Sequence, residues 1–143
     1  MNAHINRVAH WDLPQILQLA GQLGYPSHVS ELEKRYIELT KHSHHSIFKY
    51  EEAEKIIGWI HLEKVYDLIE ETKLEVKALI VHEDARGTGV GHALIEHAKL
   101  WGKQQGLHTI YLSCNILREQ SHEFYKREGF SLTKTSHFFE LKL

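Results

Sequence analysis

The spacing of apolar residues near the start of the chain predicts a short strand and then a helix. Residues 4–9 alternate loosely between apolar and polar, which is typical of a strand. Apolar residues then recur at helical spacing within residues 16–23. Asp12 stands before this stretch as a favoured N-cap residue, and Gly24 and Pro26 follow it as stop signals.

The next segment changes from a helical to a strand period. Ser30 and Glu33 form a capping-box pattern, which predicts the start of a second helix. Residues 46–52 and 55–65 are instead rich in β-branched and aromatic residues. A short charged turn around Ala53 separates them, so we expect a β-hairpin.

The remaining pattern alternates strands with helices. Residues 73–81 become increasingly apolar, as a central strand does, and an amphipathic helix ending at Gly106 follows a glycine-rich turn. We expect a strand at 108–114, a helix at 121–128, and final strands from 130–143. The predicted fold class is α/β, with a mixed central sheet and the order β-α-α-β-β-β-α-β-α-β.

Composition narrows the class of protein. The chain has 143 residues, which is enough to bury a core, and we expect a single domain over residues 1–143. A net charge of −2 argues against a nucleic-acid partner. No apolar run approaches the roughly 20 residues of a membrane span, and no secretory signal is visible, so we expect a cytoplasmic protein. Cys114 is the only cysteine, so it has no partner for an intrachain disulfide.

Histidine is unusually frequent, with thirteen in the chain. His42, His44 and His45 form the one dense group. Metal sites usually draw their ligands from separate elements, so we interpret this group as a polar loop and expect no metal site.

The glycine-rich turn is the strongest chemical signal. Gly87, Gly89 and Gly91 follow Arg86 between an apolar strand and a helix. The spacing fits neither the dinucleotide fingerprint G-x-G-x-x-G nor the phosphate loop, which needs a lysine after the last glycine. Backbone amides that converge without Cβ obstruction, the helix N-terminus and the arginine together predict a cradle for an anion such as pyrophosphate. The alternative is a glycine-rich turn without a ligand.

Two segments resemble the GNAT superfamily of N-acetyltransferases, which use acetyl-CoA. One is ALIVHEDARGTGVGHALIEHA, with strand, turn, R-G-x-G-x-G loop and helix in register. The other is NILREQSHEFYKREGF, where an asparagine after a strand precedes a helix ending F-Y-x-x-x-G-F. With the strand-helix-helix opening, the resemblance covers nearly the whole chain.

The resemblance implies where acetyl-CoA binds. Backbone groups of Leu79, Ile80 and Val81 would pair with the pantetheine arm as an added strand does. Asn115 would bond the same arm from the neighbouring strand. The remaining implied residues hold the pyrophosphate or line the other side of the cofactor: Arg86, Gly87, Thr88, Gly89, Val90, Gly91, His92, Ser121 and Phe124.

The resemblance also implies an acid and a base. Acetyl transfer needs a neutral amine and a protonated leaving thiolate. Tyr125 is the candidate acid, with core packing beside Phe124 as the alternative. Glu75 is the candidate base, directly or through water, with a solvated strand-edge charge as the alternative. We discount Cys114 as a nucleophile, because nothing near it in the sequence would activate it.

The acceptor is less defined. An acidic segment holding Asp67, Glu70, Glu71 and Glu75 would favour a cationic amine if it faces the cleft, and an ordinary acidic loop is the alternative. We expect a small-molecule or peptide amine as the acceptor. A non-catalytic module that binds acyl-CoA as a sensor is the second hypothesis. The implied fold also suggests a homodimer through the C-terminal strands, and the oligomeric state stays open.

Overall fold

The computed structural model describes residues 2–22, 24 and 28–143. It divides into two compact units, residues 1–113 and residues 114–143, and each is described by itself. Among the described residues, no helix is long and apolar enough to cross a membrane. The single domain that we expect from the chain length therefore stays a prediction.

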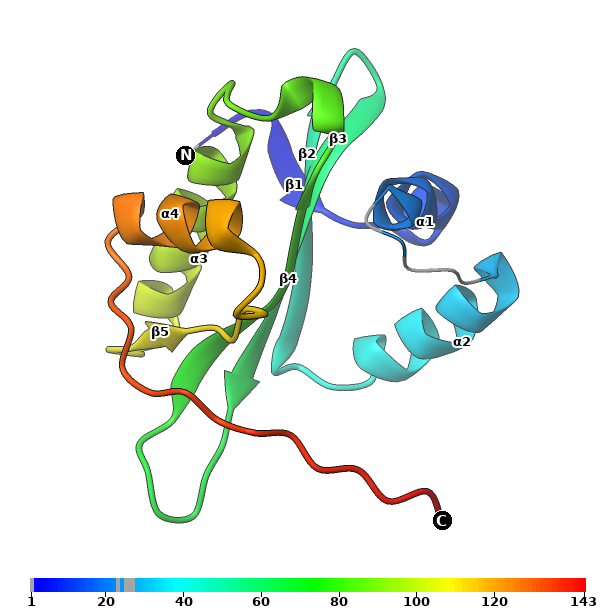
Figure 1. Cartoon of the computed structure of the whole chain (residues 1–143). Coiled ribbons are helices and arrows are strands. Elements are labelled where there is room, and N and C mark those ends of the chain that lie inside the picture. Colours follow the sequence, from blue (N-terminus) through cyan, green and yellow to red (C-terminus); the bar gives the residue numbers. More distant parts are fainter. Residues whose placement is uncertain (1, 23, 25–27) are drawn as a thin grey trace. The chain divides into compact units, whose positions relative to one another are not determined.

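The first unit is built on a five-stranded sheet with its strands in chain order (Figure 1). The strands are β1 (Ile5–Arg7), β2 (His45–Glu52), β3 (Lys55–Val65), β4 (Lys73–Val81) and β5 (Ile110–Tyr111). The first four pair antiparallel and β5 joins β4 in parallel, so the sheet is mixed as expected.

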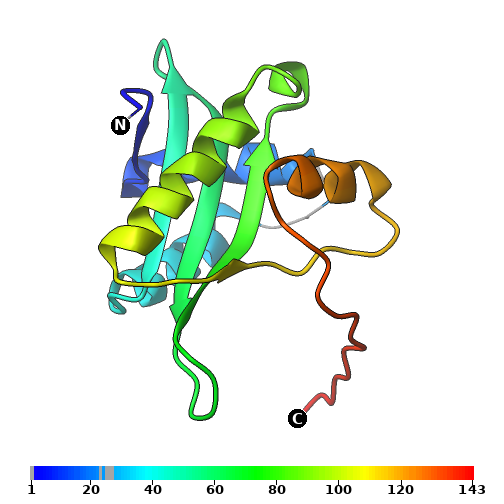
Figure 2. The same ribbon diagram turned by 90° about the vertical axis from the view of Figure 1, so that its left-hand side faces the viewer.

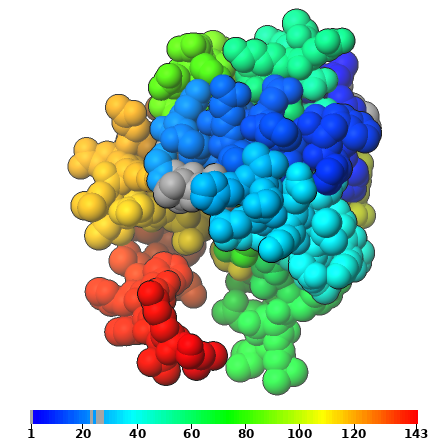
Figure 3. Space-filling view, turned by 90° about the vertical axis from the view of Figure 1, so that its right-hand side faces the viewer, coloured from blue at the N-terminus to red at the C-terminus, as the bar shows by residue number. Residues whose placement is uncertain are grey.

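Helices cover both faces of this sheet. The first two, α1 (Leu13–Gly21) and α2 (Val29–Thr40), lie on one face, and α3 (Val90–Gln104) lies on the other (Figures 1 and 2). Figure 3 looks onto the side where α1 and α2 cover the sheet. Two short 3-10 turns, η1 (His10–Asp12) and η2 (Glu83–Ala85), precede α1 and the glycine loop.

The face under α3 is an apolar core. Ile60 and Leu62 of β3 and Leu94 and Ile95 of α3 have no exposed surface. A Cβ on Gly58 would lie 2.9 Å from a methyl carbon of Val90, so glycine lets α3 approach the strand closely. This packing fixes the start of α3 against the sheet.

The opposite face carries a second core under α1 and α2. Val8, Ile16 and Ile80 are buried there, with Trp59 partly buried beside them. Asp12 does not cap its helix with its side chain. Its buried carboxylate accepts the Ala9 N–H at 2.7 Å and pairs with Lys49 Nζ at 2.9 Å.

The hairpin turn and the end of α3 match the sequence pattern. Ala53 and Glu54 both have positive φ, 48° and 64°, the conformation that a tight two-residue hairpin turn requires. Gly106 has φ of 76° immediately after α3, as a C-terminal glycine stop does.

Two predicted helix boundaries are wrong. Ser30 lies inside α2, which begins at Val29 after His28, so the capping box does not form. The first helix ends at Gly21, before the predicted stop signal at Gly24. Pro26, the other predicted stop, lies outside the described residues.

The second unit contains α4 (Glu119–Arg127) followed by Gly129 with φ of 99°. Residues 130–143 form no strand, so the predicted final β element is wrong and the observed order is β-α-α-β-β-β-α-β-α. A loose alternation of apolar residues forms a strand only where a neighbouring strand supplies hydrogen bonds. The homodimer expected through those strands stays a prediction.

Candidate functional site

The glycine loop lies between η2 and α3, where the sequence places it. Gly87 and Gly89 have φ of 78° and 95°, and Gly89 is the N-cap residue of α3. A Cβ on either glycine would meet no heavy atom within 4 Å. Glycine is therefore needed for the backbone conformation, and the space beside the loop is open to an incoming group.

The loop has the properties of an anion cradle. The first N–H groups of a helix have no intrahelical acceptor and carry a partial positive charge. Arg86 is exposed at the start of the loop, and the Val90 side chain is buried, so Val90 offers its backbone alone. The Thr88 hydroxyl donates to the Ala85 carbonyl and fixes the preceding turn. One turn thus brings together the seven predicted residues from Arg86 to His92, in an arrangement that suits a pyrophosphate.

An open strand edge leads toward this loop. The parallel ladder joins β4 and β5 only at Leu74 with Ile110 and at Glu75 with Tyr111. From Val76 onward no strand of the described sheet pairs with this edge of β4. The unpaired edge can accept an extended ligand in the manner of an added strand.

The register of β3 and β4 decides which peptide groups face that edge. The His82 N–H donates to the Ile57 carbonyl at 2.8 Å, which defines a hydrogen-bonded pair. Since such pairs alternate along an antiparallel ladder, Ile80 turns its peptide groups toward β3. Leu79 and Val81 turn theirs toward the open edge. Of the three residues predicted to bond the pantetheine arm, these two have the required direction.

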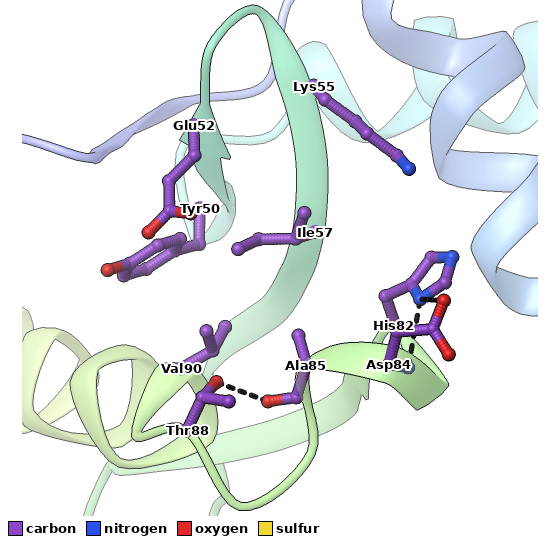
Figure 4. Close-up of a pocket in the computed structure, with 9 residues that line it drawn as sticks. All are labelled: Tyr50, Glu52, Lys55, Ile57, His82, Asp84, Ala85, Thr88 and Val90. Atoms are coloured by element: carbon purple, nitrogen blue, oxygen red, sulfur yellow. Dashed lines mark hydrogen bonds and ion pairs between the residues drawn. The ribbon is translucent and has the colours of Figure 1, made fainter.

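A separate pocket lies between the β2–β3 hairpin and the start of α3 (Figure 4). It includes Thr88 and Val90 of the glycine loop. Its lining includes two acidic residues, Glu52 and Asp84, against one lysine, Lys55, and this balance disfavours a phosphate. The complete lining is Tyr50, Glu52, Lys55, Ile57, His82, Asp84, Ala85, Thr88 and Val90. We therefore place the predicted anion cradle on the glycine loop and not in this pocket.

A polar cluster occupies the α1–α2 side of the sheet at the end nearest β5. Register pairs His45 with Glu63 and Glu63 with Glu75, so these side chains share one face. A β-bulge in β4, opposite His61 and Leu62 of β3, leaves Lys77 unpaired in the register and adds it to the same group. The cluster, called the His61 cluster below, consists of His45, His61, Glu63, Glu75, Lys77 and Tyr111.

Lys77 holds the two carboxylates of this cluster together. Its Nζ lies 3.1 Å from Glu63 Oε1 and 3.5 Å from Glu75 Oε1. Burial by itself would lower the pKa of Lys77, but the hydrogen bond to Glu63 and the charge of Glu75 raise it on balance. Glu75 is 21% exposed and ion-paired, so it is not the solvated edge charge that the sequence left as an alternative.

Two hydrogen-bonded histidines with tilted rings complete the cluster. His45 Nδ1 and His61 Nε2 are 2.9 Å apart and share a hydrogen bond. Burial, followed by His45 and Lys77, lowers the pKa of His61 to about 4. Burial also lowers the pKa of His45, against the opposing charge of Glu63. Both imidazoles are therefore neutral at pH 7.

Sequence reasoning found Glu75 but missed the rest of this cluster. The available signal was a period of two: His61 and Glu63 occupy alternate positions of an otherwise apolar strand, on a face expected to be buried. Lys77 could not be placed in this way, because a β-bulge changes which side of the strand it faces.

The second unit holds the other predicted residues. The rings of Tyr125 and Phe124 are 5.1 Å apart, and Tyr125 also contacts Phe130 at 5.7 Å between ring centres. Burial, and after it the neighbouring Cys114, raises the pKa of Tyr125 to about 12. Tyr125 is therefore protonated at neutral pH, as an acid must be before it donates.

Asn115 lies before α4, and Ser121 lies in its first turn. The Asn115 side chain accepts the Leu117 N–H at 2.9 Å, and its carbonyl bonds His122 Nε2 at 2.8 Å. Ser121 is half-buried within α4. Their predicted contacts with the cofactor stay predictions.

Most carboxylates of the acidic segment before β4 bind groups within the segment or next to it. The Asp67 carboxylate accepts the N–H groups of Ile69 and Glu70 at 2.7 and 2.9 Å. Glu70 pairs with Lys73 at 3.2 Å, and Glu71 accepts the Thr109 hydroxyl at 2.9 Å. These contacts are those of an ordinary ordered loop, which was the alternative interpretation, and only Glu75 of the segment joins the His61 cluster.

Comparison with known proteins finds relatives that are N-acetyltransferases. Among curated proteins, the aminoalkylphosphonate N-acetyltransferase of Salmonella typhimurium is 34% identical over 85 residues, which are 59% of this chain and 53% of that protein. The match therefore spans about half of that relative's length.

Solved structures share the fold at lower identity. The aminoglycoside N-acetyltransferase AAC(6')-Iy in complex with CoA has a TM-score of 0.82 at 17% identity, covering 97% of this chain and 99% of that one. A GNAT family acetyltransferase of Staphylococcus aureus has a TM-score of 0.81 at 21% identity, covering 96% and 97%. A model of the acetyltransferase (GNAT) family matches residues 10–130. Because that match spans most of the chain, the protein belongs to the GNAT family of acetyltransferases.

Proposed function

We propose that the protein is an N-acetyltransferase that moves the acetyl group of acetyl-CoA to the primary amine of a small molecule or peptide. The observation that carries the proposal is the glycine loop at the N-terminus of α3, placed beside an open edge of β4. Together they offer an anion cradle and an extended backbone surface, which match the pyrophosphate and the pantetheine arm of CoA.

The chain supplies binding and proton handling, and acetyl-CoA supplies the activated thioester. The loop amides from Arg86 to His92 hold the pyrophosphate, with Leu79 and Val81 bonding the arm. Asn115, Ser121 and Phe124 complete the cofactor set in the proposal. The amine attacks the acetyl carbon directly in a ternary complex, so no covalent bond to the protein forms.

Tyr125 holds the proton that the leaving sulfur needs. A phenol whose pKa is raised to about 12 keeps its proton at neutral pH. Glu75 is the proposed base, acting through water, because its ion pair with Lys77 orients the carboxylate on the sheet face.

The curated relative favours a small primary amine as acceptor, since it is an aminoalkylphosphonate N-acetyltransferase. The second candidate, a sensor that binds acyl-CoA without turnover, needs the same cradle but no acid or base. Both candidates therefore predict CoA binding, and only the enzyme predicts acetyl transfer.

Glycine-to-tryptophan variants at the two ends of α3 test the cradle. Gly89 and Gly106 both have positive φ, and a Cβ at either position would meet open space, so Gly89→Trp and Gly106→Trp carry similar backbone strain. The two positions lie at opposite ends of the helix, roughly 25 Å apart. We expect thermal-shift titration to show stabilisation by acetyl-CoA and CoA, and none by NAD, in the wild type and Gly106→Trp. In Gly89→Trp we expect no stabilisation by acetyl-CoA or CoA. Equal shifts in both variants would place CoA elsewhere.

Tyr125→Phe separates the enzyme from the sensor. We expect turnover with an amine panel of aminoalkylphosphonates, polyamines and aminoglycosides to fall about tenfold or more, on the scale of general acid catalysis. The affinity for CoA should change little. Absence of transfer by the wild type to every amine, with CoA binding intact, would favour the sensor, and equal turnover in the variant would return Tyr125 to core packing.

A further inference from the structure

Three potential metal ligands meet where the chain enters β2. His44 lies in the turn before the strand, His45 is its first residue, and Glu63 is the register partner of His45 on β3. One ligand atom from each of the three lies within 4.8 Å of the others. All three residues are partly buried, so the group is not a set of fully solvated side chains.

The backbone holds this group in place. The Lys64 N–H donates to the His44 carbonyl at 2.7 Å, which ties the turn to β3. The rings of His44 and His45 are 4.6 Å apart, and His45 Nε2 lies 3.9 Å from Glu63 Oε1. Ligand atoms around a tetrahedral ion with bonds of about 2.0–2.2 Å lie about 3.3–3.6 Å apart. Small side-chain rotations therefore bring the three atoms to coordination distance.

The donor set is that of a zinc-type site. Two imidazole nitrogens and one carboxylate oxygen bind Zn²⁺ and other first-row divalent ions, and three protein ligands leave a position for water or an anionic oxygen. Glu63 comes from a second element, 18 positions after His45 in the chain. This contribution distinguishes the site from the histidine-rich stretch that the sequence indicated.

The hydrogen bond between His45 and His61 supports coordination. If His45 binds an ion through Nε2, its proton must sit on Nδ1, the atom that lies 2.9 Å from His61 Nε2. At that distance His61 Nε2 can accept a hydrogen bond from the Nδ1–H group of His45. Metal-bound histidines are commonly oriented by such a second contact.

The charges around these three residues also suit a cation. Glu63 and Glu75 face Lys77, so two carboxylates are matched by one ammonium. Lys77 can keep Glu75 as its partner when Glu63 turns to an ion. Other titratable side chains near this group include Tyr111 of β5 and two whose rings contact His44, namely His42 at 5.3 Å and Tyr66 at 6.2 Å between ring centres.

We propose that His44, His45 and Glu63 form a binding site for a first-row divalent metal ion, with His61 positioning His45. The site does not include the glycine loop, so the metal proposal does not depend on the acetyl-CoA proposal. Zn²⁺ alone is the probe, measured on CoA-free protein purified without a polyhistidine tag.

Calorimetric titration with Zn²⁺ tests the site. We expect one saturable equivalent per chain in the wild type. Affinity should fall about tenfold or more in His45→Ala and in Glu63→Gln, which keeps the size of the side chain. His108→Ala removes an exposed histidine outside the site and should bind as the wild type does. Circular dichroism of the zinc-free variants confirms that each is folded.

Cobalt provides a second readout that does not depend on folding energy. Co²⁺ bound by two histidines and a carboxylate gives a visible absorption band, which should be lost in Glu63→Gln and retained in His108→Ala. Zinc affinity that is equal in the wild type, His45→Ala and Glu63→Gln would overturn the proposal, because the ion would then bind elsewhere. No saturable binding by the wild type would overturn it as well.

Discussion

The two faces of the same strands differ sharply in chemistry. Toward α3, Ile60 and Leu62 of β3 are fully buried among apolar neighbours. On the opposite face, the residues alternating with them include His61 and Glu63 of the His61 cluster. One strand thus contributes to a buried apolar core on one face and to a polar cluster on the other.

The packing of the helices accounts for this difference. The α3 face can be closed completely because α3 packs along the strands, and that packing fixes the glycine loop at its N-terminus. The α1–α2 face keeps charged groups near β5, where the sheet ends in a two-residue strand. We expect variants on the first face to change mainly stability, and variants on the second to change mainly pH response and activity.

The largest expected effect is loss of packing on the α3 face. Leu94→Ala removes a fully buried side chain that contacts β3 near Gly58, so the free energy of unfolding should fall by about 2–5 kcal/mol. Leu100→Ala is the matched control, because Leu100 is 47% exposed on the same helix. Urea unfolding measures both. Similar losses at the two positions would contradict the assignment of the closed face.

The next effect is a pH dependence from the polar face. The pKa of His61 is about 4 in the folded protein and near 6.5 in the unfolded chain. Below pH 6.5 the unfolded chain binds a proton that the folded protein does not, so stability is fully present above that pH and falls until about pH 4. The contribution of His61 should be on the order of 2–3 kcal/mol.

His61→Gln tests this effect because it removes the titrating group. The difference in unfolding free energy between pH 7 and pH 4 should shrink in His61→Gln and stay unchanged in His108→Gln, which alters an exposed histidine. Denaturant unfolding across that pH range measures both. An unchanged slope in His61→Gln would mean that the His61 imidazole is not shielded from water.

Local sequence signals predicted the elements on the α3 face well. Strand β4 spans the predicted residues 73–81, and α3 begins at the glycines and ends before Gly106. These boundaries depend on nearest neighbours: positive φ, a helix N-terminus and an apolar run. The prediction of strands in residues 130–143 was wrong for the opposite reason. A strand there would need a partner strand, and the local sequence pattern does not specify one.

The candidate site also has one part that local sequence signals predict and one part that they do not. The proposed anion cradle is contiguous in sequence, so the glycine motif alone is enough to predict it. The His61 cluster gathers residues from β2, β3, β4 and β5 through register and a β-bulge, and neither can be read from one sequence. Glu75 was predicted alone, without the Lys77 that the bulge brings to it.

The smallest expected effect concerns Glu75 itself. Glu75→Gln keeps the size of the side chain and leaves Lys77 paired with Glu63 at 3.1 Å, so unfolding free energy should change by less than about 1 kcal/mol. If Glu75 is the base, kcat/KM for the amine should fall about tenfold and lose its acidic pH limb, while KM for acetyl-CoA stays the same.

Glu96→Gln on the exposed side of α3 is the control, since it also replaces a carboxylate paired with a lysine. Steady-state kinetics across pH compare the two variants. Full activity in Glu75→Gln would leave Glu75 as a partner of Lys77 and nothing more. The ion pairs and histidines of the polar face would then affect stability and its pH dependence. The amine would lose its proton to solvent and not to Glu75.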